Sequence, residues 1–423
     1  MTASGVEPSP PHQRLSILWI ARTCPLPAND GEKQRVYNLL KALAHWHDLT
    51  VVFRLIEPEE QAGLHAMRRI CKAVHALQIP RPSGVLDRLR WAAPFVFSRY
   101  PLSLCTVYFD PVRRLLQEVV NATAFDIVQV EHSSLSIYLD KLRLPMRLGR
   151  YPATILTLHN IDYLRSARVL ANQRPGLRWL YMKLDSIKFR AWEMAALKRF
   201  DHVIAMSQLD RQLLLADSPQ LQVSVVPNGV DAAAVPYAPP VPASERVVFV
   251  ASMDSDANHD GAMFLMQEIW PLVKARRPAA RLVIVGRGPR PALLNLHNGQ
   301  DIVVTGKVNE VLSYYRGAAV AVVPLRSGGG TRLKILEAMA AGLPVVTTTV
   351  GCEGIEAQTG VHALFADEPK AFAAAVLRLM DEPALALRLS LAAREFVERL
   401  YDWGVIASGH DALYRQAAQH ADG

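Results

Sequence analysis

The sequence predicts an α/β protein built from two Rossmann-like, doubly wound domains that face a central cleft. Apolar runs of strand length alternate with helical segments along the 423 residues, as in parallel sheets covered by helices. A stretch rich in Ala and Pro, residues 232–244, separates two such series and is expected to be a stiff linker. With 50% hydrophobic residues the chain can bury two cores. Ligands of such domains bind at the carboxyl ends of the strands, so we expect the site in the cleft.

The predicted strands fall into two sets. Those of the first domain, residues 14–231, are the apolar segments 15–20, 49–55, 127–130, 154–158, 202–206 and 222–226. Those of the second domain, residues 245–402, are 247–251, 281–285, 302–305, 319–323, 345–348 and 363–365. An amphipathic helix at about 403–418 ends the pattern.

The most informative segment begins after the predicted strand 319–323 with three consecutive glycines, namely Gly328, Gly329 and Gly330. Because glycine lacks Cβ, backbone N–H groups in this turn can approach a ligand closely. Thr331 is the expected N-cap of the next helix, whose amino end attracts anions. Arg332 and Lys334 lie in the first turn, where cations oppose the helix dipole unless an anion binds beside them. The segment therefore predicts a phosphate site.

The same helix carries one carboxylate in an apolar setting. Glu337 shares a stripe with Leu333, Leu336 and Ala340, and the helix is apolar on nearly every side, so we expect it to be buried. A buried carboxylate needs hydrogen-bond donors, which the two hydroxyls of a ribose would supply. The alternative is a Glu that pairs with a core Arg or caps a nearby loop.

From Arg326 to Val346 the chain resembles the nucleotide-sugar site of GT-B glycosyltransferases of the family-4 type, also called glycosyl transferases group 1. This retaining group works on exopolysaccharides, glycolipids and cell-surface glycans. In its Glu-x7-Glu motif the second Glu binds the donor ribose, and Glu337 matches that position. The first Glu binds the donor sugar, and Gly329 stands there, so the chain resembles the Gly-Gly-Gly-Thr-Arg variant of the family.

Further segments resemble the family's donor site. Residues 285–288, Val-Gly-Arg-Gly, match the turn near the nucleotide base, and residues 351–354 match a Gly-x-x-Glu loop. The cations that relatives carry after the first strand of the second domain are missing here, so Arg326, Arg332 and Lys334 are expected to hold the diphosphate. The resemblance thus implies these donor contacts: Gly31, Arg287, Arg326, Gly328, Gly329, Gly330, Thr331, Leu333 and Glu353.

In the first domain the resemblance assigns three side chains. His159 directly follows the predicted strand 154–158, where the family keeps a His that contacts the donor sugar; from position alone, a structural His is the alternative. Arg35 is expected on the first turn of a helix from Val36 to Ala44, where it would contact phosphate or acceptor. Asp162 would bind the acceptor, or else cap the helix that follows.

Composition limits the class and compartment. The four cysteines have no C-x-x-C spacing, so neither a disulfide framework nor a zinc site is implied. Residues 1–13 lack the apolar core of a signal peptide, and no run approaches the roughly 18 apolar residues of a spanning helix. We therefore expect a cytoplasmic protein.

The positive charge lies in the first half of the chain. Residues 1–231 hold 29 Lys and Arg against 20 Asp and Glu, and residues 141–199 hold 13 against 3. Such a face suits nucleic acid, anionic lipid or a phosphorylated acceptor; the alternative is an ordinary solvated helix surface. Residues 81–100 are expected to form either an amphipathic membrane-surface element or a buried connector. Together with the resemblance, this predicts an anionic membrane surface as a partner, at the inner face, and no nucleic acid.

The predicted reaction is transfer of a sugar from a nucleoside-diphosphate sugar to a saccharide or lipid-linked saccharide. We expect retention at the anomeric carbon and neither cofactor nor metal, with His159, Arg332, Lys334 and Glu337 as the catalytic set. Two alternatives are an epimerase or phosphorylase of the same architecture, and a protein that binds a nucleotide sugar without catalysis. The absence of the first Glu of the motif motivates the second alternative.

Overall fold

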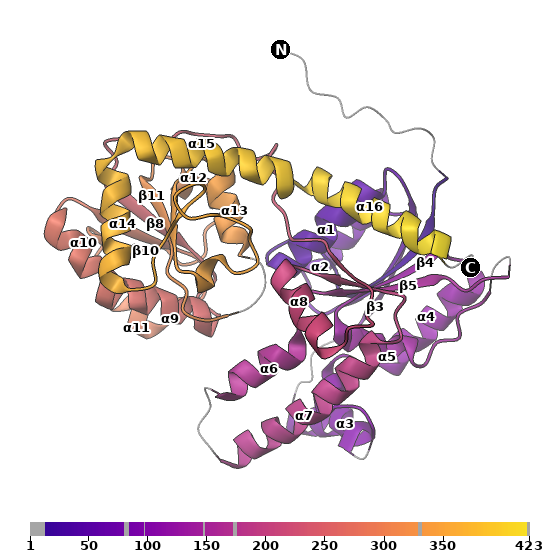
Figure 1. Cartoon of the computed structure of the whole chain (residues 1–423). Helices are drawn as coiled ribbons and strands as arrows, with labels where there is room; N and C mark the ends of the chain where they lie inside the picture. Colours follow the sequence, from indigo (N-terminus) through magenta and orange to yellow (C-terminus); the bar gives the residue numbers. More distant parts are fainter. Residues whose placement is uncertain are drawn as a thin grey trace. The chain divides into compact units, whose positions relative to one another are not determined.

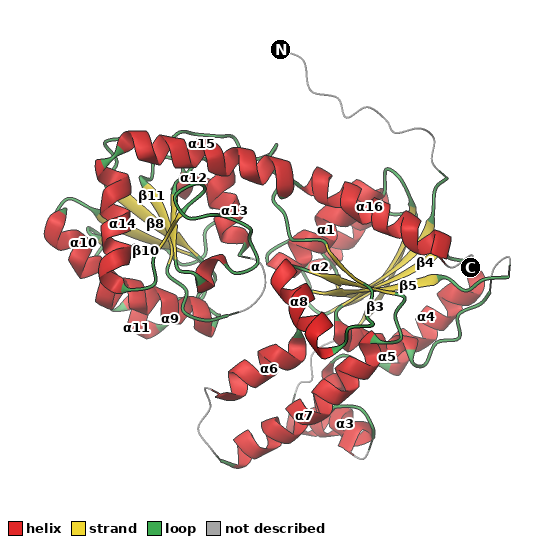
Figure 2. Ribbon diagram, in the orientation of Figure 1, coloured by secondary structure: helices red, strands yellow, loops and turns green. Residues whose placement is uncertain are grey.

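The computed structural model describes residues 13–79, 84–96, 98–146, 149–171, 176–328 and 332–420. Within them the chain forms two units (Figure 1). The N-terminal domain holds residues 13–205, Leu214–Ser224 and the chain from Ala407 onward, and the C-terminal domain holds Met206–Leu213 and Val225–Ile406. In each unit helices cover a sheet (Figure 2), so the predicted class of two Rossmann-like domains is confirmed.

Over the described residues, the N-terminal sheet has seven strands in the order β3-β2-β1-β4-β5-β6-β7. They are β1 Ser16–Thr23, β2 Asp48–Leu55, β3 Ala73–Gln78, β4 Ile127–Glu131, β5 Ala153–Leu158, β6 His202–Ala205 and β7 Val223–Val225. The pairs from β3 to β6 are parallel. The sequence does not predict β3, because this edge strand is only half-buried and carries His75 and Gln78 among its apolar residues.

The helices of the N-terminal domain cover this sheet by apolar stripes. In α4, for example, Val112, Leu116, Val119 and Val120 are buried at helical spacing while the charged residues face water. The set comprises α1 Gly31–Leu43, α2 Glu60–Ile70, α3 Val85–Val96, α4 Asp110–Ala122, α5 Ser136–Leu139, α6 Asp162–Ala171, α7 Leu177–Leu197 and the short 3-10 helices η1 Leu102–Thr106 and η2 Ser133–Leu135. Two further helices, α8 Gln208–Asp217 and α16 Trp403–His420, are divided between the two units, with their C-terminal parts in this one.

The amino end of α1 differs from the prediction. Asp30 is the N-cap, with its carboxylate accepting a hydrogen bond of 2.9 Å from the backbone N–H of Lys33. The helix therefore begins at Gly31, and the predicted start at Val36 is wrong. The single glycine of this loop opens the helix instead of forming a separate phosphate turn.

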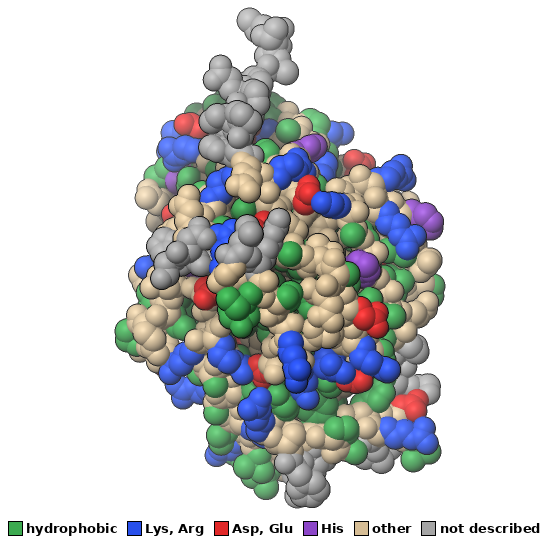
Figure 3. Space-filling view, turned by 90° about the vertical axis from the view of Figure 1, so that its right-hand side faces the viewer, with side chains coloured by type: hydrophobic (Ala, Val, Ile, Leu, Met, Phe, Trp, Pro, Cys, Tyr) green, Lys and Arg blue, Asp and Glu red, His purple; other side chains and the backbone are tan. Residues whose placement is uncertain are grey.

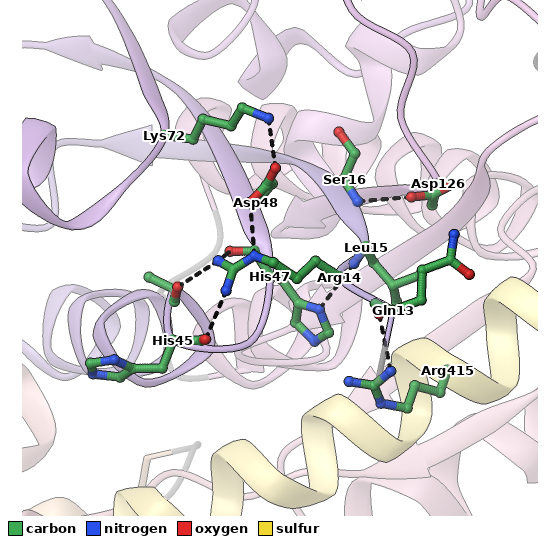
Figure 4. Close-up of polar contacts among 11 residues, drawn as sticks. Gln13, Arg14, Leu15, Ser16, His45, His47, Asp48, Lys72, Asp126 and Arg415 are labelled. Carbon is green, nitrogen blue, oxygen red and sulfur yellow. Dashed lines mark hydrogen bonds and ion pairs between the residues drawn. The ribbon is translucent and has the colours of Figure 1, made fainter. Parts of the chain in front are cut away.

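Polar contacts fix the start of β1 to its neighbours (Figure 4). Arg14 donates from Nε to Asp48 at 3.0 Å, and Lys72 binds the other oxygen of that carboxylate at 2.6 Å. From α16, Arg415 donates to the carbonyl of Gln13 at 3.3 Å. The described residues of α16 from Ala407 onward thus pack on the N-terminal domain, although α16 follows the last strand of the other unit in sequence.

The C-terminal domain has, over its described residues, six strands in the order β10-β9-β8-β11-β12-β13. They are β8 Arg246–Val250, β9 Arg281–Val285, β10 Ile302–Val304, β11 Val320–Val323, β12 Val345–Thr347 and β13 Leu364–Phe365. All pairs are parallel, and each strand lies where the sequence predicts it. The helices are α9 Asp256–Phe264, the π-helix η3 Leu265–Ile269, α10 Trp270–Arg276, α11 Pro291–Leu294, α12 Leu312–Tyr315, α13 Leu333–Ala340, the 3-10 helix η4 Val350–Cys352, α14 Pro369–Asp381 and α15 Pro383–Leu400.

The Ala- and Pro-rich segment 232–244 packs on the C-terminal domain. Arg394 of α15 donates to the carbonyls of Ala232 and Val235 at 2.8 Å each. Gly342, at φ 90°, lies so close to this segment that a Cβ there would meet the carbonyl oxygen of Ala238 at 2.3 Å. The segment is therefore held along its length by side-chain and backbone contacts within one unit.

None of the helices in the described ranges is long and apolar enough to cross a membrane.

Candidate active site

The predicted phosphate site lies at the carboxyl end of β11 in the C-terminal domain. Gly328, at φ 120°, leaves room for the guanidinium of Arg332, which a Cβ would meet at 2.9 Å. Helix α13 begins at Leu333 with Arg332 in the N-cap position, so the helix starts one residue later than predicted from Thr331. Three expected donor contacts, Gly329, Gly330 and Thr331, lie outside the described residues.

Lys334 is held in a partly apolar position in the first turn of α13. Its Nζ donates to Oδ1 of Asn258 at 2.6 Å and lies 5.4 Å from the ring centre of Phe249. Asn258 is fixed in turn, since its amide donates to the carbonyl of Ser252 at 2.8 Å. Burial, and then the charge of Arg332, lower the pKa of Lys334 to about 7. An anion bound beside this lysine would restore its charge.

Glu337 lies one turn further along α13, half-buried. Burial raises the pKa of this carboxyl group, although Lys334 opposes the rise. Burial, and then the charge of Glu337, also raise the pKa of Tyr315, whose hydroxyl donates to the backbone carbonyl of Lys334 at 3.4 Å. Over the described residues, the Glu337 carboxylate has neither a hydrogen bond nor an ion pair. The alternative of a Glu paired with a core Arg is therefore not found.

Arg326 occupies a different setting from Lys334. Its guanidinium binds Asp260 through two hydrogen bonds of 2.6 and 3.1 Å and lies 4.5 Å from the ring centre of Phe264. Its side chain is 46% exposed. A phosphate at Arg326 would compete with the carboxylate of Asp260, and the donor contact of this arginine stays a prediction.

The glycine turn after β9 packs tightly against the end of β8. A Cβ on Gly286, at φ 149°, would lie 1.7 Å from the carbonyl oxygen of Ala251, so only glycine fits. The turn carries Arg287, whose Nε donates to Ser252 and pairs with Asp254 at 3.2 Å. Asp256, two residues further along the chain, pairs with Arg290.

The remaining donor positions lie at the same edge of the sheet. Leu333 is the first, half-buried residue of α13, and Glu353 follows η4 after β12, also half-buried. Since the strands are parallel, the carboxyl ends of β8, β9, β11 and β12 meet at one edge. The structure thus brings Arg287, Arg332, Lys334, Glu337 and Glu353 to one side of the C-terminal sheet.

The N-terminal domain holds its own polar cluster, at the carboxyl ends of β4 and β5. Nε2 of His159 lies 2.5 Å from a carboxylate oxygen of Glu131, the last residue of β4. The imidazole of His132 stacks on that of His159 with ring centres 4.4 Å apart. Burial and the neighbouring His132 lower the pKa of His159, while the bond to Glu131 opposes them.

His132 is held in an unusual backbone conformation, at φ 79°. Such a conformation is costly for a residue with a side chain and is concentrated at functional sites. Its Nε2 lies 3.0 Å from a carboxylate oxygen of Glu32, which Arg22 also binds at 2.6 Å. Burial opposes ionisation of Glu32, but His132 and Arg22 outweigh it and hold the pKa of this carboxyl group well below its usual range.

The sequence prediction missed Glu131, His132 and Glu32. A signal was present for the first two, because both residues directly follow a predicted strand at its carboxyl end, as His159 does. Neither the stacking of the two imidazoles nor the backbone conformation of His132 could be inferred from one sequence.

Two predicted acceptor contacts are placed differently by the structure. Arg35 is fully buried in α1, where burial lowers its pKa to about 10 and Glu131 and Tyr414 oppose that change. The contact of Arg35 with phosphate or acceptor therefore stays a prediction, for a side chain that this structure buries. Asp162 begins α6 and accepts a hydrogen bond of 3.3 Å from Ser133, so it has the helix-start position of the alternative reading. Gly31 is the first residue of α1.

A second buried carboxyl group lies beside Asp162. Glu193 of α7 accepts a hydrogen bond of 2.8 Å from the backbone N–H of Tyr163. Burial, and then the charge of Asp162, raise the pKa of Glu193 to about 8. The turn between β5 and α6, which follows His159, is thus anchored by an acid that is mostly protonated at neutral pH.

Comparison with known proteins defines the class. The family described as Glycosyltransferase Family 4 matches residues 30–234, and the family described as Glycosyl transferases group 1 matches residues 244–382. Together with the two parallel-sheet domains, these matches show that the chain belongs to the GT-B glycosyltransferases and is a transferase.

Three individual similarities add detail. The chain is 20% identical to an uncharacterized 44.6 kDa protein in the cps region of Klebsiella pneumoniae, over 91% of this chain and 96% of that protein. It is 29% identical to the phosphatidyl-myo-inositol mannosyltransferase of Mycobacterium leprae, over 46% of this chain and 53% of that enzyme. Among solved structures, Anabaena HepE, in complex with UDP and glucose, matches with a TM-score of 0.65 at 12% identity, covering 95% and 99% of the two chains.

Proposed function

We propose that the protein transfers a sugar from a nucleoside-diphosphate sugar to a saccharide or lipid-linked saccharide during synthesis of exopolysaccharide or another cell-surface glycan. The observation that carries this proposal is the pair Lys334 and Glu337 near the start of α13. An anion would restore the charge of the lysine, and over the described residues the carboxylate makes neither a hydrogen bond nor an ion pair. The similarity to HepE, which binds UDP and glucose, and to a mannosyltransferase named for a lipid acceptor supports the substrate classes.

The residues would divide the work as follows. Lys334, Arg332 and the amides at the start of α13 would neutralise the charge that builds on the leaving diphosphate. Glu337 would accept hydrogen bonds from the ribose hydroxyls. His159, neutral and held by Glu131, would orient the donor sugar. We propose that the transfer proceeds with retention and without a metal ion, since the cations at α13 can supply the charge that a metal otherwise provides.

Donor turnover tests the proposal. A screen of nucleotide sugars by thermal shift selects the donor, since a bound ligand raises the melting temperature. Release of nucleoside diphosphate is then measured with a saccharide or lipid-linked acceptor for the wild type and for Lys334→Ala, Glu337→Ala and His159→Ala. We expect all three variants to fold and to lose turnover, and full activity of the wild type in EDTA. Undiminished turnover in Lys334→Ala and Glu337→Ala would rule out the assignment.

The same screen separates the alternatives. An epimerase would convert the donor without acceptor, and a phosphorylase would require inorganic phosphate. A binding protein would show stabilisation by a nucleotide sugar and no turnover with any acceptor. We also propose a cytoplasmic location with peripheral attachment to the inner face of the membrane, where a lipid-linked acceptor would be found.

A further inference from the structure

One helix of the N-terminal domain carries a stripe of apolar side chains that the fold leaves in solvent. Leu180, Leu184 and Ile187 of α7 are 49%, 61% and 61% exposed, and Ala191 continues the same face. Their spacing of four, three and four residues places them on one side of the helix. Single exposed leucines are common on protein surfaces, but a row of them on one helix is not.

The opposite side of α7 holds the helix in the domain. Phe189, Trp192 and Ala196 are buried against the rest of the unit. Asp185 accepts a hydrogen bond of 2.7 Å from the backbone of Leu102, and Lys188 donates to the carbonyl of Ser98 at 2.5 Å. These contacts fix the rotation of α7 about its axis, so the apolar stripe is turned away from the core.

Basic side chains lie beside the stripe. Lys183 and Arg190 are exposed and project about 70° and 90° from the centre of the stripe on a helical wheel of about 100° per residue. Arg190 forms an ion pair of 3.3 Å with Asp217, and the ammonium of Lys183 lies 4.8 Å from the ring centre of Trp179. Figure 3 shows Lys and Arg side chains on one face of the molecule, interspersed with Asp, Glu and apolar side chains. An apolar stripe with cations at its side is complementary to anionic lipid.

The sequence also offers residues 81–100 as either an amphipathic membrane-surface element or a buried connector. There Phe95 and Tyr100 are buried, and Trp91 packs edge-on against Phe109 with ring centres 4.8 Å apart. These aromatic side chains pack inside the N-terminal domain, as the buried-connector alternative predicts. Leu86 of the same segment is 74% exposed, but on α7 three exposed apolar side chains form one row.

We propose that α7 is the membrane-docking helix of this enzyme, with Leu180, Leu184 and Ile187 inserted among the acyl chains of an anionic bilayer and Lys183 and Arg190 at the headgroups. This inference rests on the proposed function in one respect, that a lipid-linked acceptor brings the enzyme to a membrane. It names the surface and the lipid chemistry that would hold the enzyme there.

The test is sedimentation of the full-length protein with vesicles. Vesicles of equal parts phosphatidylcholine and phosphatidylglycerol are compared with pure phosphatidylcholine, at low and at high salt. We expect the wild type to bind the anionic vesicles, and binding to fall at least about tenfold in the double variant Leu184→Ser with Ile187→Ser. The matched control is Leu387→Ser with Leu391→Ser on α15, which removes two leucines that are 43% and 52% exposed and should leave binding unchanged.

Several results would overturn the proposal. The proposal is wrong if the wild type does not bind anionic vesicles. It is also wrong if the α7 double variant binds them as well as the wild type does. A wild type that is dimeric without lipid and becomes monomeric in the α7 variant would make the stripe a self-association surface. The proposed function is assayed separately, because donor turnover in detergent should be the same for the α7 variant and the wild type. If neither the wild type nor the α7 variant turns over any donor, and the wild type still binds vesicles, the proposed function is rejected but the docking role of α7 is not.

Discussion

Replacing Lys334 by Met removes one ammonium group from the predicted phosphate site and tests whether that charge binds the donor. Met keeps the apolar length of the side chain and deletes the ammonium that lies 2.6 Å from Asn258. In the free protein burial lowers the pKa of Lys334 to about 7, so this charge is weakened at neutral pH before a donor binds. The substitution should therefore affect folding and function in different ways.

The substitution should not destabilise the protein. A pKa lowered from 10.5 to about 7 corresponds to about 5 kcal/mol of unfavourable burial of the charge. Removing the lysine relieves that cost and loses a hydrogen bond worth about 1 kcal/mol. The first contribution outweighs the second, so the melting temperature should be equal to or above that of the wild type.

The expected effect on catalysis is large. A charge-assisted hydrogen bond to the diphosphate contributes about 1.5–3 kcal/mol, and more as charge builds on the leaving group. We expect kcat/KM for the donor to fall about 100-fold, measured by release of nucleoside diphosphate. The control is Lys370→Met, which removes an exposed lysine of α14 and should change nothing. A Lys334→Met enzyme within threefold of the wild type, roughly 0.65 kcal/mol, would refute the reasoning.

Three further outcomes follow from the geometry. Because a bound diphosphate raises the pKa of Lys334 from about 7, donor binding at pH 8 should take up protons, and the affinity should fall as pH rises. Calorimetry in buffers of different ionisation enthalpy measures this proton uptake, and zero uptake would contradict the prediction. Glu193 has its pKa raised to about 8, so stability should fall as pH rises from about 4 to about 8, and Glu193→Gln should melt higher than the wild type at pH 8 but not at pH 4. Gly286→Ala should lower the free energy of unfolding by about 3 kcal/mol or more. Gly306→Ala, at φ 69° with open space around a Cβ, should lower it by only about 1–2 kcal/mol. Equal melting temperatures of the two variants would show that the clash with Ala251 is relieved.

The fold could be predicted from the sequence wherever burial made the pattern simple. The strands of the C-terminal sheet are short apolar runs such as 281–285, and each was found. The edge strand β3 was missed because it is half-buried and interrupted by His75. Strands that contact water on one side carry a weaker apolar signal.

The site was predictable only in part, for a physical reason. Lys334 and Glu337 were recognised because they are charged residues in an otherwise apolar helix. Asn258 does not, since its contact with Lys334 joins residues 76 positions apart. The burial of Arg35 beside Glu131 was not predictable either, because nothing in its local sequence indicates it.

The most direct test of the donor site is calorimetric binding of the nucleoside diphosphate that stabilises the protein most, compared with its 2′,3′-dideoxy analogue. If Glu337 accepts the ribose hydroxyls, the wild type should prefer the natural nucleotide by about 1.5–3 kcal/mol. In Glu337→Ala that preference should disappear, with both nucleotides bound equally weakly. A preference that survives in Glu337→Ala would contradict the assignment of α13 as the nucleotide-sugar site.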